Sequence, residues 1–241
     1  MQWNSSGFSG LAIQVILHEC FFVPYVSTPK NSPHCDFCSR LYLTKKLLRC
    51  CFDEVTRRVT DMKGVIFTEL FNVVEQSQGA NFLDDLIDAC DLPSCGAYTS
   101  VGTYDFAEMQ TLVAELSKRT HIPAAALLEH FGQHLFKRFH ALYPNLFAGH
   151  DCPLRFLMEV EVVIHKEVLK LYPEAELPSF TTLDHTPNSL TLLYESRRGL
   201  APLALGLIRG CLLHFDTLGT VNMEADPAGF NKAVFTIQLN S

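Results

Sequence analysis

The sequence lacks an excess of positive charge, a bilayer-length apolar run and any low-complexity segment. Lys and Arg number 19 against 26 Asp and Glu, a net charge of -7, which argues against the basic surface that nucleic-acid binding requires. The apolar run over residues 11–26 contains several polar residues and is shorter than the roughly 20 residues that span a bilayer. With 13 Gly and 12 Pro in 241 residues, the chain is neither collagen-like nor disordered. We expect neither a nucleic acid nor a membrane as partner.

A secretory leader is also not expected. Residues 1–10 carry no positive charge, although the first region of a signal peptide is positively charged. The nine cysteines are then most simply read as reduced thiols, which are typical of the cytosol. The sequence therefore predicts a cytoplasmic protein.

Charge and cysteine are unevenly distributed along the chain. Residues 1–61 hold seven Lys and Arg against five Asp and Glu, and five of the nine cysteines. Residues 62–241 hold 12 against 21, and four cysteines. Arg57-Arg58 lies just before Met62, and in a bacterial gene such a pair can be encoded by a purine-rich ribosome-binding sequence. We therefore interpret residues 1–61 as a doubtful extension, translated from upstream of a true start at Met62, and residues 62–241 as the folded domain.

The extension contains part of a zinc-binding pattern. Cys35 and Cys38 have the spacing of half a zinc site, and His34, Cys50 or Cys51 could supply further ligands. Cys50 and Cys51 are adjacent, whereas the second half of such a site usually has two residues between its ligands. The pattern leaves zinc binding by residues 1–61 open.

Apolar periodicity after Met62 predicts a helical front half. Asn81 is expected to cap the second helix, and Pro123 to open a short one. Residues 91–102, broken by proline and glycine, are expected to form a loop. The expected helices run from Met62 to Gly79, from Asn81 onward, and over residues 105–119, 124–130, 132–143 and 154–172.

The pattern changes after Pro178. Strands are expected over residues 189–197, 220–224 and 232–239. A helix is expected over residues 203–215, with two glycines, Gly206 and Gly210, that would allow close packing. The predicted fold class is α+β, with a helical N-terminal subdomain followed by an antiparallel sheet with helices.

His165 is the first candidate for a ligand-binding residue. Its neighbours at helical spacing include Val162, Val168 and Leu169, so the imidazole lies on an apolar stripe. Such a histidine is either a hydrogen-bonded core residue or a ligand that faces an apolar cavity. The pattern alone favours the core residue.

Tyr194, Ser196 and Arg198 form the second feature. In a strand, alternate residues share a face, so these donors would lie in a row about 6.8 Å apart. A phenol, a hydroxyl and a guanidinium suit carboxylates or phosphates, although alone the row could also be an exposed strand end. An imidazole in apolar surroundings beside an anion clamp matches haem, whose iron takes an axial histidine and whose propionates need donors.

Residues 62–241 resemble the haem nitric oxide/oxygen-binding (H-NOX) family, whose sensor domain also occurs in soluble guanylate cyclase. The resemblance rests on Met62-Lys63-Gly64 at the start, on His165 followed by Lys-Leu-Tyr-Pro at 170–173, and on Tyr-x-Ser-x-Arg at 194–198. It implies an H-NOX fold that encloses haem b. His165 would be the proximal iron ligand, and Tyr194, Ser196 and Arg198 would hold the propionates.

The resemblance also implies contacts with the rest of the haem. Ile66 and Pro178 match positions that press on the macrocycle and keep it non-planar. Relatives that hold oxygen stably use a distal tyrosine, but the matching position here is Leu203. In those relatives polar residues support the tyrosine, and the matching positions here are Leu135 and Leu70. The further expected haem contacts are Leu203, Leu135, Leu70 and Phe139.

These substitutions predict a nitric oxide sensor that binds carbon monoxide more weakly and forms no stable oxygen complex. By resemblance, signalling follows from strain or rupture of the bond between iron and His165. No output module follows the domain, so we expect a non-enzymatic sensor whose separate partner is a histidine kinase or a diguanylate cyclase. The alternatives are an oxygen-binding or redox haem sensor and a haem-free module for an anionic ligand. An enzyme with Cys90 or Cys95 as nucleophile is a weaker alternative, because neither lies in a recognisable motif.

Overall fold

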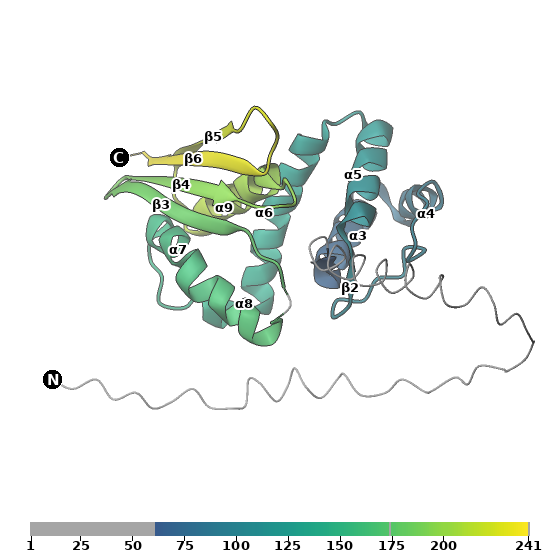
Figure 1. The fold of residues 1–241 in the computed structure, drawn as a ribbon, viewed down its shortest axis with the longest axis horizontal. Coiled ribbons are helices and arrows are strands. Elements are labelled where there is room, and N and C mark those ends of the chain that lie inside the picture. The colour runs from purple at the N-terminus through teal and green to yellow at the C-terminus, as the bar shows by residue number, and fades with distance from the viewer. Residues whose placement is uncertain (1–60, 174, 241) are drawn as a thin grey trace, which may run out of the picture. The chain divides into compact units, whose positions relative to one another are not determined.

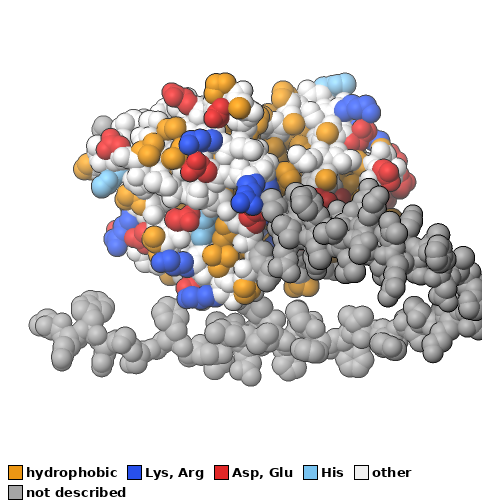
Figure 2. Space-filling model, viewed as in Figure 1, with side chains coloured by type: hydrophobic (Ala, Val, Ile, Leu, Met, Phe, Trp, Pro, Cys, Tyr) orange, Lys and Arg blue, Asp and Glu red, His pale blue; other side chains and the backbone are white. Residues whose placement is uncertain are grey.

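The computed structural model describes residues 61–173 and 175–240, all of which fall within one compact unit. The cysteines and His34 of the open zinc pattern lie outside the described residues. Within the described ranges no helix is long and apolar enough to cross a membrane. On the face of the protein drawn in Figure 2, acidic and basic side chains are interspersed.

The front half of the described chain consists of helices and a short two-stranded ribbon. Gly79, with a φ of 91°, separates the first two helices. The Asp105 side chain caps α5 by accepting a hydrogen bond from the Ala107 amide at 2.9 Å. The elements are β1 (Asp61–Lys63), α3 (Gly64–Gln78), α4 (Ala80–Asp88), β2 (Thr103–Asp105), α5 (Phe106–Thr120) and α6 (Ala124–Leu142).

The back half is built on a four-stranded antiparallel sheet of order β3-β4-β6-β5. Alternate residues of β4 and β6 are buried, so one face of the sheet packs into the core. The elements are η1 (Pro144–Leu146), α7 (Pro153–Glu159), the π-helix η2 (Val160–Ile164), α8 (His165–Leu171), β3 (Ser179–Thr186), β4 (Ser189–Glu195), α9 (Ala201–His214), β5 (Gly219–Ala225) and β6 (Lys232–Leu239).

Two hydrophobic cores lie along this arrangement. The N-terminal core is formed by α3, α4, α5 and the first half of α6. The C-terminal core lies between the sheet and the helices α7 and α9. Figure 1 shows α6 between the sheet and the helices α3 to α5. Phe139 and Leu207 pack against both cores, so α6 and α9 join the two halves.

Close helix packing makes that junction possible. A Cβ atom on Gly206 would collide with the Glu129 carbonyl, and one on Gly132 would collide with the Leu203 carbonyl. Glycine at these positions therefore lets the backbones of α6 and α9 approach each other. The expectation of close packing at Gly206 and Gly210 is confirmed, since Gly210 lies against the Phe136 side chain.

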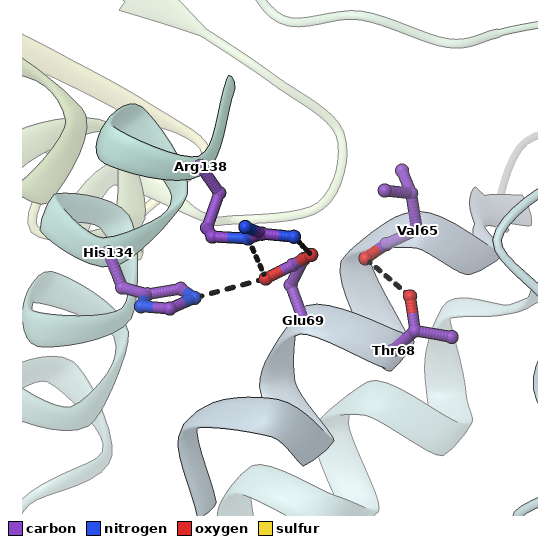
Figure 3. A network of polar contacts seen from close by, with 5 residues as sticks. All are labelled: Val65, Thr68, Glu69, His134 and Arg138. Carbon is purple, nitrogen blue, oxygen red and sulfur yellow. Dashed lines mark hydrogen bonds and ion pairs between the residues drawn. The ribbon is translucent and has the colours of Figure 1, made fainter. Parts of the chain in front are cut away.

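A buried ion pair links α3 to α6. Glu69, only 4% exposed, accepts hydrogen bonds from Arg138 at 2.9 and 3.0 Å and contacts the His134 imidazole at 3.1 Å. Figure 3 shows both partners reaching from α6 to the carboxylate on α3. In the preceding turn of α3, Thr68 donates to the Val65 carbonyl. The paired and hydrogen-bonded carboxylate can be buried because its charge is compensated.

The α+β class is confirmed, but several local predictions are wrong. Asn81 lies inside α4 rather than at its cap, which is Gly79. The two helices expected around Phe131 are one continuous helix, because Gly132 is tolerated where α9 packs closely. The strand β3 was not predicted, because most of its residues are exposed and give no alternating pattern.

Candidate functional site

His165 is the first residue of α8 and directly follows the π-helix η2. Its side chain is 13% exposed, and its Nδ1 lies 3.0 Å from Oε2 of Glu161. Burial lowers the pKa of His165, and the Glu161 carboxylate opposes that shift. A neutral imidazole is the form that binds a metal. The regular helix expected over residues 154–172 is thus interrupted immediately before His165 by a π-helical turn, a feature that is frequent at functional sites.

The three donors of the Tyr-x-Ser-x-Arg motif do not form the expected row on one strand face. Tyr194 lies in β4 and is 1% exposed, but the strand ends at Glu195, not at Arg197. Ser196 and Arg198 lie in the following turn, where the Arg198 amide donates to Ser196 Oγ at 3.2 Å. The turn therefore redirects Arg198, and the strand-based spacing does not apply beyond Glu195.

Arg198 points into the protein, and its side chain is only 9% exposed. It donates to the main-chain carbonyls of Glu176, at 2.6 Å, and of Asp61, and its terminal nitrogen lies 3.5 Å from the Glu176 carboxylate. Its Nε is buried and has no hydrogen-bond partner within the described part of the chain. A buried guanidinium with an unpartnered donor is what a carboxylate-bearing cofactor such as haem requires.

Tyr194 is linked to His165 through Phe180 of β3. The ring centroids of His165 and Phe180 are 6.0 Å apart, and those of Phe180 and Tyr194 are 5.4 Å apart. Phe180 and Tyr194 are also direct partners in the sheet register. The structure thus connects the helix that carries the histidine, through β3, to the strand that carries the first residue of the motif.

Most of the expected haem contacts lie in the N-terminal core, whereas Phe139 and Pro178 lie outside it or at its boundary. Leu70 and Leu135 are buried in the N-terminal core, and Ile66 and Leu203 pack against it. Phe139 packs against both cores. Pro178 is half-buried in the segment between α8 and β3. The N-terminal group is thus hydrocarbon throughout, which suits the wall of an apolar cofactor.

Sequence reasoning missed two residues at this site, Glu161 and Glu176. Glu161 stands four residues before His165, a spacing at which helical side chains meet, so its contact could have been found. The hydrogen bond from the Phe180 amide to Glu161 Oε2, at 3.2 Å, could not, because β3 itself was not predicted. Glu176 lies in an irregular segment, where periodicity gives no signal.

The chain is similar to a known protein family and to several solved structures. A family model described as Haem-NO-binding matches residues 63–224. The ferrous, unliganded H-NOX protein from K. algicida is 38% identical over 75% of this chain and 97% of its own, with a TM-score of 0.72. The ferrous nitric oxide complex of an H-NOX protein from S. oneidensis is 28% identical over 75% of this chain and all of its own (100%), with a TM-score of 0.69.

A third H-NOX structure, the ferrous carbon monoxide form from Shewanella woodyi with IWP-051 bound, is 35% identical over 73% of this chain and 94% of its own, with a TM-score of 0.64. No curated protein sequence matches the chain. The combination of helices and an antiparallel sheet in this chain matches the fold of these H-NOX structures. The chain therefore belongs to the H-NOX family of haem-based gas sensors.

Proposed function

We propose that residues 62–241 bind haem b through His165 and sense nitric oxide. The observation that carries this proposal is the largely buried imidazole of His165, whose Nδ1 is engaged by Glu161 while Nε2 remains for a metal. The bound haem would supply a ferrous iron that accepts a gas ligand. The family match over residues 63–224 supports the assignment of the sensor to this part of the chain.

Two sets of residues would hold the haem. Arg198, with its buried and unpartnered Nε, would bind a propionate, and the hydroxyls of Tyr194 and Ser196 would add neutral donors. Ile66, in α3, and Pro178, between α8 and β3, would press on the macrocycle. The residues that would line its apolar faces are Leu70, Leu135, Phe139 and Leu203.

The same apolar residues support nitric oxide as the ligand. Leu70, Leu135 and Leu203 carry no hydrogen-bond donor, and a stable oxygen complex takes up negative charge that a donor would stabilise. Nitric oxide binds ferrous haem tightly without such help, and carbon monoxide would bind more weakly. In the solved relatives, the S. oneidensis protein holds nitric oxide and the Shewanella woodyi protein carbon monoxide.

The signal would leave the site through the helix of His165. Ligand binding would strain or break the bond between iron and His165, and α8 would then shift against the sheet. A separate signalling protein, a histidine kinase or a diguanylate cyclase, would read that shift in the cytoplasm, with the domain itself acting as a sensor and not as a catalyst. The four described cysteines are free thiols, which supports a reducing compartment.

Ligand selectivity can be tested by absorption spectroscopy of the reduced, haem-loaded chain. We expect a nitric oxide complex at stoichiometric ligand and no stable oxygen complex in air. Leu203→Tyr, which adds a hydroxyl, should slow autoxidation in air, whereas Leu203→Phe, which adds a ring without a hydroxyl, should not. A stable oxygen complex of the unmodified chain would contradict the proposal.

A further inference from the structure

One oxygen atom of Glu161 holds two separate parts of the domain. Oε2 of Glu161 lies 3.0 Å from Nδ1 of His165 and accepts the main-chain N–H of Phe180 at 3.2 Å. His165 belongs to α8 and Phe180 to β3. The carboxylate is therefore a bridge between the helix of the histidine and the edge of the sheet.

Glu161 lies in the π-helix η2, one turn before His165. The His165 amide donates to the Val160 carbonyl, five residues earlier, which is the wider turn of a π-helix. Glu161 and His165 nevertheless share one side of the helix, and the side chain of Glu161 is 42% exposed against 13% for His165. The carboxylate thus reaches the imidazole from the solvent side, and the Phe180 amide fixes its position there.

The bridge determines which nitrogen of His165 carries the proton. The Phe180 N–H is a donor only, so Oε2 acts as an acceptor in that contact. An ionised carboxylate can only accept hydrogen bonds, so the contact between Glu161 Oε2 and Nδ1 of His165 places the imidazole proton on Nδ1. With its proton on Nδ1, a neutral imidazole presents its lone pair on Nε2.

A carboxylate behind a metal-bound histidine also changes its electron donation. Such a partner fixes the orientation of the ring and makes the imidazole a stronger ligand, and its loss typically lowers metal affinity about 10- to 100-fold. Glu161 is the one carboxylate within hydrogen-bond distance of His165 in the described residues. Its position makes it the residue that can adjust the strength of the bond between iron and His165.

The geometry points to Glu161 as a positioning residue that holds His165 with Nε2 free for iron, strengthens its bond to the metal, and ties its movement to β3. This inference rests on the proposed haem binding. Phe180 pairs with Tyr194 in the sheet, so the bridge connects the ligand helix to the strand that carries the first residue of the Tyr-x-Ser-x-Arg motif. A weaker bridge would release His165 from the iron more readily when nitric oxide binds.

The test uses the full haem-loaded chain and two variants. Glu161→Gln keeps an acceptor but removes the charge, and Glu161→Ala removes the acceptor. The ferrous iron–histidine stretching band in resonance Raman spectra should fall in frequency from the native chain to Gln and further to Ala. The fraction of the nitric oxide complex that has lost its histidine should rise in the same order, and haem affinity should fall about tenfold in the Ala variant.

Glu167→Gln is the matched control. Glu167 lies on α8, the helix of His165, and its carboxylate pairs with Lys170 at the surface. Its loss should leave the stretching band unchanged. An unchanged band in both Glu161 variants would overturn the inference, as would an equal shift in the Glu167 control.

A measurement without any substitution covers the case in which the Glu161 variants do not fold. Nitrogen NMR of the haem-free native chain, labelled at histidine, should show His165 neutral with its proton on Nδ1. A proton on Nε2 would overturn the inference. The proposed haem binding fails separately, if the native chain takes up no haem, whereas the inference fails alone if haem binds through His165 and the band does not respond to Glu161.

Discussion

At the scale of single residues, Arg198 both stabilises the main chain around it and offers a donor to a ligand. Its terminal nitrogens hold the main chain at Glu176 and Asp61, and its Nε is left for a ligand. Burial lowers the pKa of Arg198, and the nearby Glu176 carboxylate opposes the shift. A propionate would satisfy the remaining donor, so haem binding and local folding are expected to reinforce each other at this residue.

This arrangement predicts unequal effects within the motif. Arg198→Leu should speed haem loss about 10- to 100-fold, because a hydrogen bond to a charged group contributes about 1.5–3 kcal/mol. Ser196→Ala should have a smaller effect, since it removes a neutral donor. The measurement is the rate of haem transfer to an excess of apomyoglobin. The control is Arg197→Leu, because the native Arg197 side chain is 69% exposed, and this variant should lose haem at the native rate. Faster haem loss from Ser196→Ala than from Arg198→Leu would contradict the assignment.

Residue type and spacing drew attention to His165 and Arg198 but did not assign their roles. Taken alone, the apolar stripe around His165 favoured a core residue, and both roles were implied only by the resemblance to the H-NOX family. The inward turn of Arg198 was not predictable, because it depends on the end of β4 at Glu195. Glu161 gains its second contact from Phe180, nineteen residues away, and no local pattern reports such a contact.

At the scale of elements, Glu69 joins α3 to α6 beside the hydrophobic core that the two helices share. Leu70 directly follows Glu69, and Leu135 directly follows His134. Both leucines are expected haem contacts. The hydrogen bonds of Arg138 and His134 to Glu69 therefore fix the spacing of the two helices at the positions that would line the distal side of the haem.

Removing this charge should destabilise the domain in a pH-dependent way. Glu69→Gln should lower the free energy of unfolding by about 1–3 kcal/mol at neutral pH, because Arg138 and His134 would lose the charge of their buried acceptor. Burial opposes ionisation of Glu69, but the hydrogen bonds from Arg138 and His134 outweigh it and hold its pKa below the ordinary 4.5. A lowered pKa contributes stability above the unfolded value, and this contribution is lost as pH falls through the folded value.

The difference between the native chain and Glu69→Gln should therefore shrink as pH falls below about 4.5. The difference in the free energy of unfolding is measured by urea unfolding of the haem-free chain, followed by circular dichroism at several pH values. Glu75→Gln, on the exposed side of α3, should unfold like the native chain at every pH. A difference that stayed constant down to acid pH would show that the Glu69 charge does not contribute.

Most helices could be predicted from sequence, whereas two kinds of element could not. The helices α3 and α5 have apolar stripes, and α9 is apolar along most of its length, so all three were predicted close to their observed ends. The ribbon of β1 and β2 has three residues in each strand, too few for a pattern. The π-segment keeps helical periodicity in the sequence, so its wider turn gives no sequence signal.

At the scale of the whole molecule, the domain consists of two cores joined through α6 and α9. The hydrocarbon residues expected on the distal side belong to the N-terminal core, and His165 and Tyr194 lie with β3 and the C-terminal core. A haem that contacts both groups would couple the two halves of the domain. A change at the iron would then alter how the halves pack, which a partner protein could read.

The central claim is that His165 of this chain binds haem iron, and one spectrum tests it most directly. The full chain, reconstituted with haem and reduced with dithionite, should take up one equivalent and show a single Soret band. His165→Gly should abolish or shift that band, and added imidazole should restore it. A spectrum that is identical in the native chain and in His165→Gly would contradict the account.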